Sequence, residues 1–137
     1  MILFIIPLTV IPLILYDIVG SIWTNPWPGE IVGLTMISGS RWSFTIGDLF
    51  ILLGIVCLFF EVLKSTSSSS RTIVNHILST IVFILYLIEF MVVGIAATSA
   101  FFMLLVISLF DVVAGFTITI KTASRDVAFG RTLDSGT

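Results

Sequence analysis

Charged residues are scarce in this chain, and their scarcity excludes a whole class of proteins. Only 10% of the 137 residues are charged, whereas 58% are hydrophobic. An average soluble domain carries about a quarter charged residues, so a soluble globular enzyme is excluded. The composition instead predicts a domain that is embedded in a membrane.

Basic residues, cysteine and histidine are also few. The formal net charge of −2 comes from 8 acidic and 6 basic residues, which provides no basic face for nucleic acid. Cys57 is the only cysteine, so a disulfide within the chain is excluded, and its apolar surroundings favour a buried hydrophobic role. The sequence contains no Glu-x-x-His pair, no phosphate-binding glycine loop and no nucleophile elbow. We therefore predict no catalytic residues, no metal site and no cofactor, while a bound lipid or quinone stays open.

Four apolar stretches are long enough to cross a bilayer as helices, which takes ~20 residues. The predicted spans cover about residues 1–23, 47–64, 73–96 and 100–122. The first lacks the basic start and the cleavage site of a signal peptide, so we interpret it as a retained helix that Pro7 and Pro12 bend. The predicted fold is an all-α membrane protein, a four-transmembrane-helix bundle over 1–123 with a loose polar tail over 124–137.

The basic residues predict how the bundle is oriented, because cytoplasmic loops carry an excess of lysine and arginine. One side of the predicted topology holds Lys64, Arg71, Lys121, Arg125 and Arg131. The opposite side holds only Arg41. This bias predicts that both termini are cytoplasmic and that the connection between the first two spans is periplasmic.

The long first connection contains a period-two pattern on both sides of a glycine turn. Apolar residues alternate with other residues before and after Ser38-Gly39-Ser40, which predicts a small β-hairpin over about 31–46 on the periplasmic face. An irregular interfacial loop is the alternative. One hairpin face would carry apolar side chains that we predict to contact a partner: Val32, Leu34, Met36, Trp42 and Phe44.

Each predicted span carries a stripe of polar or small residues at helical spacing. The stripes are Thr9, Tyr16 and Gly20 with Asp17 at the edge; Gly47, Gly54, Cys57 and Glu61; Asn75, Ser79, Tyr86 and Glu89; and Ser108, Asp111, Gly115 and Thr119. In a bilayer, small residues allow close helix packing and polar groups find partners across helix interfaces. The stripes are therefore predicted to face other helices of this chain or of another subunit.

Carboxylates within the spans form the first group of candidate site residues. The candidates are Asp17, Glu89 and Asp111, with Tyr86 near Glu89, and the sequence offers these acids no basic partner inside the membrane. A charged acid at the bilayer centre costs about 2.5–3.5 kcal/mol on insertion scales. We expect Asp111 and Glu89 to be protonated, hydrogen-bonded or paired with a cation from outside the chain. They are either functional groups or interhelical hydrogen-bond donors.

A second candidate group is predicted at the cytoplasmic rim, where the second span ends and the third begins. It consists of Glu61, Lys64, Arg71 and His76. One interpretation is an interfacial ion-pair group that fixes these two helices relative to each other. The other is a site for a lipid or quinone headgroup, or for proton entry, with His76 titrating.

Two stretches support a resemblance to known proteins. Gly47-Asp48-Leu49 through Phe60-Glu61-Val62-Leu63-Lys64, together with Leu109 through Thr117, resembles small four-span inner-membrane proteins of proteobacteria that carry no assigned activity. The resemblance covers roughly residues 40–128 and implies a bacterial inner-membrane location.

Three functions are compatible with these observations. The small size, the missing catalytic motifs and the polar stripe on every span favour a non-enzymatic accessory or scaffold subunit. Its partners would be the lipid bilayer and other membrane-protein subunits or further copies of itself. The alternative is a small proton- or cation-coupled transporter that acts as an oligomer around Glu89 or Asp111. A membrane enzyme acting on lipid or quinone is the third.

Overall fold

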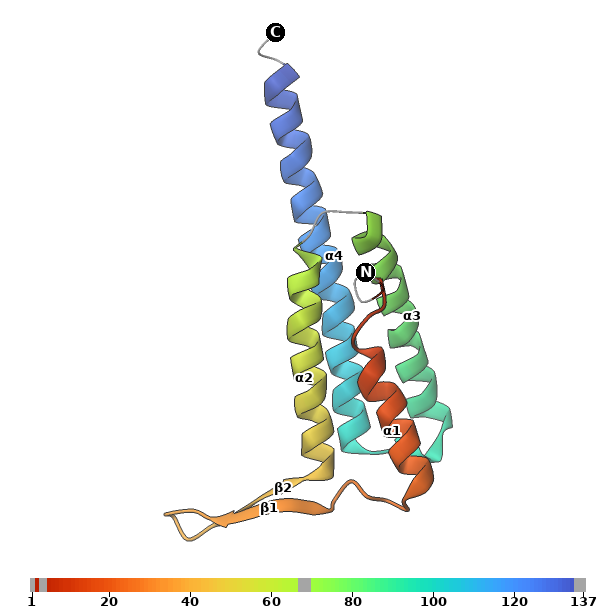
Figure 1. Cartoon of the computed structure of the whole chain (residues 1–137), viewed down its shortest axis with the longest axis vertical. Helices are drawn as coiled ribbons and strands as arrows, with labels where there is room; N and C mark the ends of the chain where they lie inside the picture. Colours follow the sequence, from red (N-terminus) through yellow and green to blue (C-terminus); the bar gives the residue numbers. More distant parts are fainter. Residues whose placement is uncertain (1, 3–4, 67–69, 135–137) are drawn as a thin grey trace.

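The computed structural model describes residue 2, residues 5–66 and residues 70–134 of the chain. The described part is mostly helical (Figure 1). Its elements in chain order are α1 (Val10–Ile22), β1 (Glu30–Thr35), β2 (Arg41–Thr45), α2 (Ile46–Ser65), α3 (Ser70–Val92), the 3-10 turn η2 (Gly94–Ala96) and α4 (Ser99–Asp134). Three of the helices, α2, α3 and α4, are long and apolar enough to cross a membrane.

The first helix is much shorter than the predicted span over 1–23, and that prediction is wrong in extent. α1 has 13 residues and begins at Val10. Pro12 lies in its first turn, where a missing backbone N–H costs no helical hydrogen bond, and Pro7 precedes the helix. The two prolines therefore mark where the helix starts instead of bending it. Thirteen residues rise only about 20 Å, less than the thickness of a bilayer core.

The helices are arranged around α4, along which both α2 and α3 pack. All three run the length of the bundle, whereas α1 occupies only the half nearest the hairpin (Figure 1). There α1 contacts α2, α4 and η2. The bundle thus has four helices in cross-section at the hairpin end and three at the other end.

The polar stripes and the apolar surface have the positions that the helical spacing predicts. Stripe residues Glu61, Ser79, Ser108 and Asp111 are buried between helices. The outward face of α3 is formed by Ile77, Ile81, Ile84 and Ile88, each about half exposed. An exposed apolar belt around a polar interior is the arrangement that suits a helix bundle in lipid.

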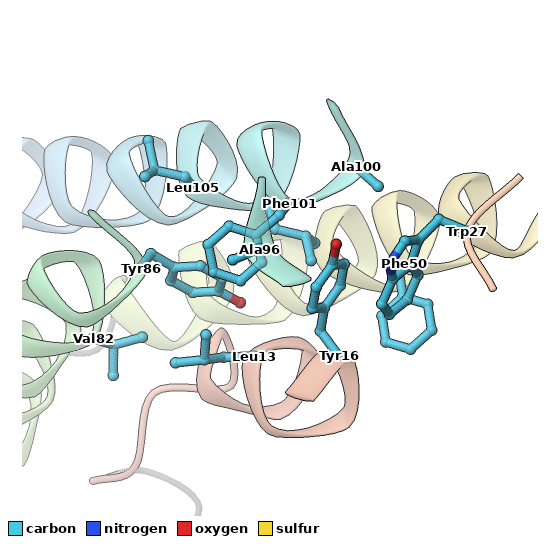
Figure 2. Packing of buried hydrophobic residues seen from close by; sticks show 11 residues of the cluster. Leu13, Tyr16, Trp27, Phe50, Val82, Tyr86, Ala96, Ala100, Phe101 and Leu105 are labelled. Carbon is cyan, nitrogen blue, oxygen red and sulfur yellow. The ribbon is translucent and has the colours of Figure 1, made fainter. Parts of the chain in front are cut away.

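Aromatic rings fill the bundle at its hairpin end. The Tyr16 ring stacks on Trp27 with centroids 3.7 Å apart and planes 4° from parallel, and Phe50 and Phe101 meet the Tyr16 ring edge-on (Figure 2). The two tryptophans that follow α1 differ in exposure, since Trp23 is 60% exposed and Trp27 only 6%. The backbone explains the difference, because the Trp27 carbonyl accepts a hydrogen bond from the Gly47 N–H and folds this segment onto the start of α2.

The predicted hairpin is confirmed. β1 and β2 pair antiparallel, with Val32 opposite Phe44 and Leu34 opposite Trp42, so these apolar side chains share one face. Gly39 has φ 86° in the connecting turn, a conformation that glycine adopts without strain. Ile46, predicted as the last hairpin residue, is instead the first residue of α2.

The last part of the chain differs from the loose tail predicted over 124–137, since α4 continues to Asp134. Extending an existing helix adds a hydrogen bond for each residue fixed, whereas nucleating a new one is costly. The segment after Lys121 contains no proline, and its alanines favour helix. The extension therefore projects beyond the other helices without packing on them (Figure 1).

Candidate functional site

The largest group of buried polar side chains lies where α1 begins. We name it the polar cluster, and it consists of Thr9, Glu61, Lys64, Asn75, Ser79 and Asp111. These residues come from α1's N-cap position and from all three long helices. Lys64 is the most exposed, with 13% of its side chain accessible, whereas Glu61 is fully buried. Glu61 lies about one turn before the end of α2, where the rim group was predicted, and it is completely buried between the helices.

Glu61 is the centre of the polar cluster because both of its oxygens accept hydrogen bonds. Oε1 accepts from the Lys64 Nζ at 2.9 Å and from the backbone N–H of Leu8, and Oε2 accepts from the Asn75 Nδ2 at 2.9 Å. The Lys64 ammonium also donates to the Ile6 carbonyl at 2.9 Å. One carboxylate of α2 thereby joins α3 to the turns that lead into α1.

Asp111 holds the next residue of that segment. Thr9 is the N-cap of α1, yet its hydroxyl caps no backbone N–H and instead donates to the Asp111 Oδ2 at 3.1 Å. The Thr9 carbonyl accepts a hydrogen bond from the Tyr86 hydroxyl at 2.8 Å. Ser79 also interacts with Asp111, while the buried Ser108 Oγ one turn away has no partner among the described residues. Thus α3 and α4 both hold the N-cap residue.

The electrostatics of the polar cluster explain how the N-terminus of α1 is stabilised inside the bundle. A helix N-terminus carries a partial positive charge and free N–H groups, and it favours nearby anions. Glu61 bonds to the Leu8 N–H and Asp111 to the Thr9 hydroxyl, and Lys64 adds a full positive charge that acts on both acids. The chain's own groups therefore supply the counter-charges that this helix end needs inside the bundle.

The predicted rim cluster is only partly brought together. Glu61 and Lys64 form their ion pair, but His76 turns to α4, where its Nε2 is hydrogen-bonded to the Thr119 Oγ1 at 2.7 Å. Its ring lies against Gly115, and its Nδ1 has no partner among the described residues. The reason is helical spacing, since His76 follows Asn75 and so faces a different neighbour. The side chain of Arg71 lies outside the part of the chain that the structure describes.

Asp17 and Glu89 form a separate pair in the half of the bundle nearest the hairpin. They lie on α1 and α3, close enough to interact, and both are partly exposed. One buried oxygen of Glu89, Oε2, has no hydrogen bond among the described residues. No basic side chain of the described residues forms an ion pair with either acid. Tyr86 lies near Glu89 as expected, and its hydroxyl donates to the Thr9 carbonyl.

The hairpin residues predicted to contact a partner are accessible. Val32, Leu34, Met36 and Trp42 are each 45–54% exposed, and Phe44 is half-buried. On the opposite face the Arg41 guanidinium forms an ion pair with Glu30 at 2.6 Å, and this pair passes directly over Gly33. The hairpin thus has one apolar and one polar face.

Sequence reasoning missed the role of Asn75 and of the Leu8 backbone in the polar cluster. Asn75 was assigned to a stripe but not to the Glu61 group, although both residues lie close to the connection between α2 and α3. Pro7 and Pro12 were the available signal for Leu8, because together they indicate that a helix begins between them. The described residues contain no group of three or more His, Cys, Asp or Glu side chains able to hold a metal ion.

Comparison of the chain with protein-family models, with curated proteins and with solved structures gives no match.

Proposed function

We propose that this protein is a non-enzymatic membrane subunit that packs against a larger membrane-protein assembly through its hairpin. The observation that carries this proposal is the exposed apolar face of β1 and β2. The hairpin reaches sideways from the end of the bundle, and within the described residues its strands pair only with each other (Figure 1). Exposed apolar patches on folded proteins usually mark interaction sites.

The occupant that suits this surface is a protein rather than lipid alone. A two-stranded sheet has free backbone N–H and C=O groups along its outer edges, and a strand from another chain satisfies them. Isolated two-stranded hairpins are marginally stable in water, so a third strand or a packed surface stabilises this one. Apolar side chains and open edges together favour docking against another polypeptide.

The hydrogen bonds of Glu61 and Asp111 within the polar cluster support a structural role. Both oxygens of Glu61 are occupied by groups of the chain itself, and Asp111 bonds to Thr9. A ligand entering the polar cluster would have to displace these bonds. The polar cluster therefore acts best as the fixed anchor of α1, which in turn supports the segment that leads to the hairpin.

We further propose a bacterial inner-membrane location with both termini in the cytoplasm. Lys64 lies in the last turn of α2, and Lys121, Arg125 and Arg131 lie in the later part of α4, whereas Arg41 begins β2 of the hairpin. These elements place the two groups at opposite ends of the bundle (Figure 1). Reporter fusions test this topology. A fusion after Thr137 should report cytoplasm and one inserted in the turn at Gly39 should report periplasm, and the reverse pattern would overturn the assignment.

Site-specific photo-crosslinking tests the docking proposal. A photoreactive residue at Leu34 should capture a protein in native membranes, whereas the same residue at Ser43 on the polar face should capture much less. The double substitution Trp42→Ser and Phe44→Ser should abolish co-purification of the captured protein, while the matched control Ser43→Asn retains it. Capture of lipid alone from Leu34, with the protein folded and inserted, would overturn the proposal.

The alternative function, a proton- or cation-coupled transporter acting as an oligomer, is favoured by one observation. Asp17 and Glu89 lie partly exposed on α1 and α3 without a basic partner in the described residues, as acids at a subunit contact would. Flux measurements in vesicles separate the two functions. Asp111→Leu and Glu89→Gln should abolish pH-dependent flux under the transport hypothesis, whereas no flux of any tested cation supports the subunit hypothesis.

A further inference from the structure

One exposed face of α4 carries a seven-residue repeat that runs from the apolar part of the helix into its free extension. Apolar or small residues recur there alternately three and four positions apart: Phe102, Val106, Leu109, Val113, Phe116, Ile120, Ala123, Val127 and Gly130. We name this row the α4 seam. All of its members are exposed except Val106, which is half-buried. The spacing is that of the a and d positions of a coiled coil, and Gly130 lies four repeats of seven after Phe102.

Lipid covers an exposed apolar face within a bilayer, but it does not cover the last part of the α4 seam. The C-terminal turns of α4 project beyond α2 and α3 (Figure 1), and Val127 is 62% exposed on them. A shallow hollow of about 470 Å³ follows the seam here, and it is lined by Ile120, Ala123, Ser124, Val127, Ala128 and Arg131. Because Ala123 and Ser124 are small, they leave room beside Val127 for a side chain of a facing helix. An exposed apolar row with such a hollow indicates a helix-packing surface.

The charged residues that flank the α4 seam determine which helix fits it. Asp126 lies at position g of the repeat and Arg131 at position e. In a parallel pair of helices, position g of one faces position e of the following heptad of the other, so Asp126 of each copy would face Arg131 of the second copy. An antiparallel pair would bring Asp126 against Asp126 and Arg131 against Arg131, and like charges repel. Neither residue forms an ion pair within the described part of the chain, so both are available for this contact.

We propose that this protein forms a parallel homodimer through the α4 seam. The a positions agree with this arrangement, because β-branched residues at a favour two parallel strands. Every a position of the seam is β-branched, namely Val106, Val113, Ile120 and Val127. Two copies that insert into one membrane in the same orientation are also parallel by necessity. The contact lies at the end of the molecule opposite to the hairpin, so it does not depend on the docking proposed for the hairpin (Figure 1).

Disulfide cross-linking of the full-length protein in native membranes tests the dimer. In a Cys57→Ser background, Ala123→Cys places the only thiol on the α4 seam, whereas Arg125→Cys places it at position f, on the far side of the helix. A disulfide requires Cα atoms within about 7 Å, so under mild oxidation Ala123→Cys should form a dimer roughly tenfold faster than Arg125→Cys. Equal rates would overturn the proposal. Cross-linking of the Ala123→Cys variant to a different protein in place of a second copy would also overturn it.

A charge exchange tests the parallel register, with dimerisation measured by energy transfer between labelled copies in liposomes. Arg131→Asp replaces two attractive contacts in each dimer by repulsion and should weaken dimerisation about tenfold. Adding Asp126→Arg exchanges the two charges and should restore the wild-type value, which it would not do if the first change had merely unfolded the helix. An unchanged Arg131→Asp variant, or a double variant that keeps its helix content by circular dichroism but stays monomeric, would overturn the proposal. Trp42→Ser with Phe44→Ser should dimerise like the wild type, and a loss of dimer there would overturn the proposal by placing the contact on the hairpin.

Discussion

The two ends of α1 are held by opposite kinds of chemistry. Its start is fixed by Leu8 and Thr9, which bond to buried acids of α2 and α4, whereas its second half is fixed by the stack of Tyr16 on Trp27. Polar contacts in apolar surroundings are all-or-none, because removing one partner leaves the others unpaired. Aromatic packing is spread over many weak contacts and is lost in proportion to the area removed. We therefore expect the free energy of unfolding to fall sharply when one polar contact at the start of α1 is removed. At the aromatic end it should fall in proportion to the buried area that is lost.

The largest effect should come from Glu61→Leu. This change leaves Lys64, Asn75 and the Leu8 N–H without their buried acceptor, which should lower the free energy of unfolding by about 3–5 kcal/mol. The measurement is denaturant unfolding in detergent micelles. The matched control, Glu30→Leu, breaks an ion pair whose side chains are 63% and 40% exposed, and it should cost at most about 1 kcal/mol. Equal losses of unfolding free energy in the two variants would contradict the expected sensitivity of the polar end of α1.

Trp27→Ala should have the next largest effect, a loss of about 3 kcal/mol in the free energy of unfolding. Trp27→Phe should cost roughly half of that, because a ring still packs against Tyr16. Trp23→Ala is the control, since Trp23 is 60% exposed and packs little. The same unfolding measurement applies to all three variants. A loss as large for Trp27→Phe as for Trp27→Ala would show that this end is also all-or-none.

Gly115→Ala should cost about 1–3 kcal/mol, because it overpacks the contact between α3 and α4. A Cβ at this position would lie 2.6 Å from the His76 Cε1 and Nδ1, so the imidazole would have to move away from Thr119. Gly94→Ala, where a Cβ would meet nothing within 4 Å, should change stability little. Urea midpoints of the two variants check this difference, and equal midpoints would contradict it.

The smallest effects should come from Tyr86→Phe and Tyr16→Phe. Each removes one hydroxyl group and keeps the ring, so the two variants compare hydrogen bonds at the two ends of α1 without a change in packing. Tyr86→Phe leaves the buried Thr9 carbonyl without its donor and should cost about 1–2 kcal/mol. Tyr16→Phe removes the donor to the Ile95 carbonyl at 3.0 Å, but Ile95 is 38% exposed and the Thr98 hydroxyl keeps its bond to the Phe101 N–H at 3.1 Å. This variant should therefore cost less, about 1 kcal/mol or below. Thermal unfolding in micelles measures both losses. A larger loss for Tyr16→Phe than for Tyr86→Phe would contradict the expected sensitivity of the polar end of α1.

The sequence predicted those features that depend on local periodicity. The alternation around Gly39 predicted the hairpin, and the stripe on each span predicted that Glu61, Ser79 and Asp111 are buried. The predicted second span over 47–64 differs from α2 by a single residue at each end. These predictions succeed because a period of two or of a helical turn determines which residues share a face.

The sequence could not predict which helices bring their polar stripes into contact with one another. Pro7 and Pro12 indicate where α1 begins, but the pairing of Leu8 with Glu61 depends on how that start packs against α2, which no local pattern indicates. The turn of His76 toward Thr119 depends on how α3 packs on α4. The burial of Trp27 follows from a backbone bond to Gly47, a contact across 20 positions of sequence that no local pattern contains.

The half-length of α1 has a consequence for the shape that the bundle presents to lipid. Four helices fill its cross-section near the hairpin, but only three fill it at the far end (Figure 1). Such a tapered body, once inserted, displaces more lipid area from one leaflet than from the other. In a bilayer such a body would act as a wedge, and a membrane curved toward its narrow end would accommodate it with less strain than a flat one.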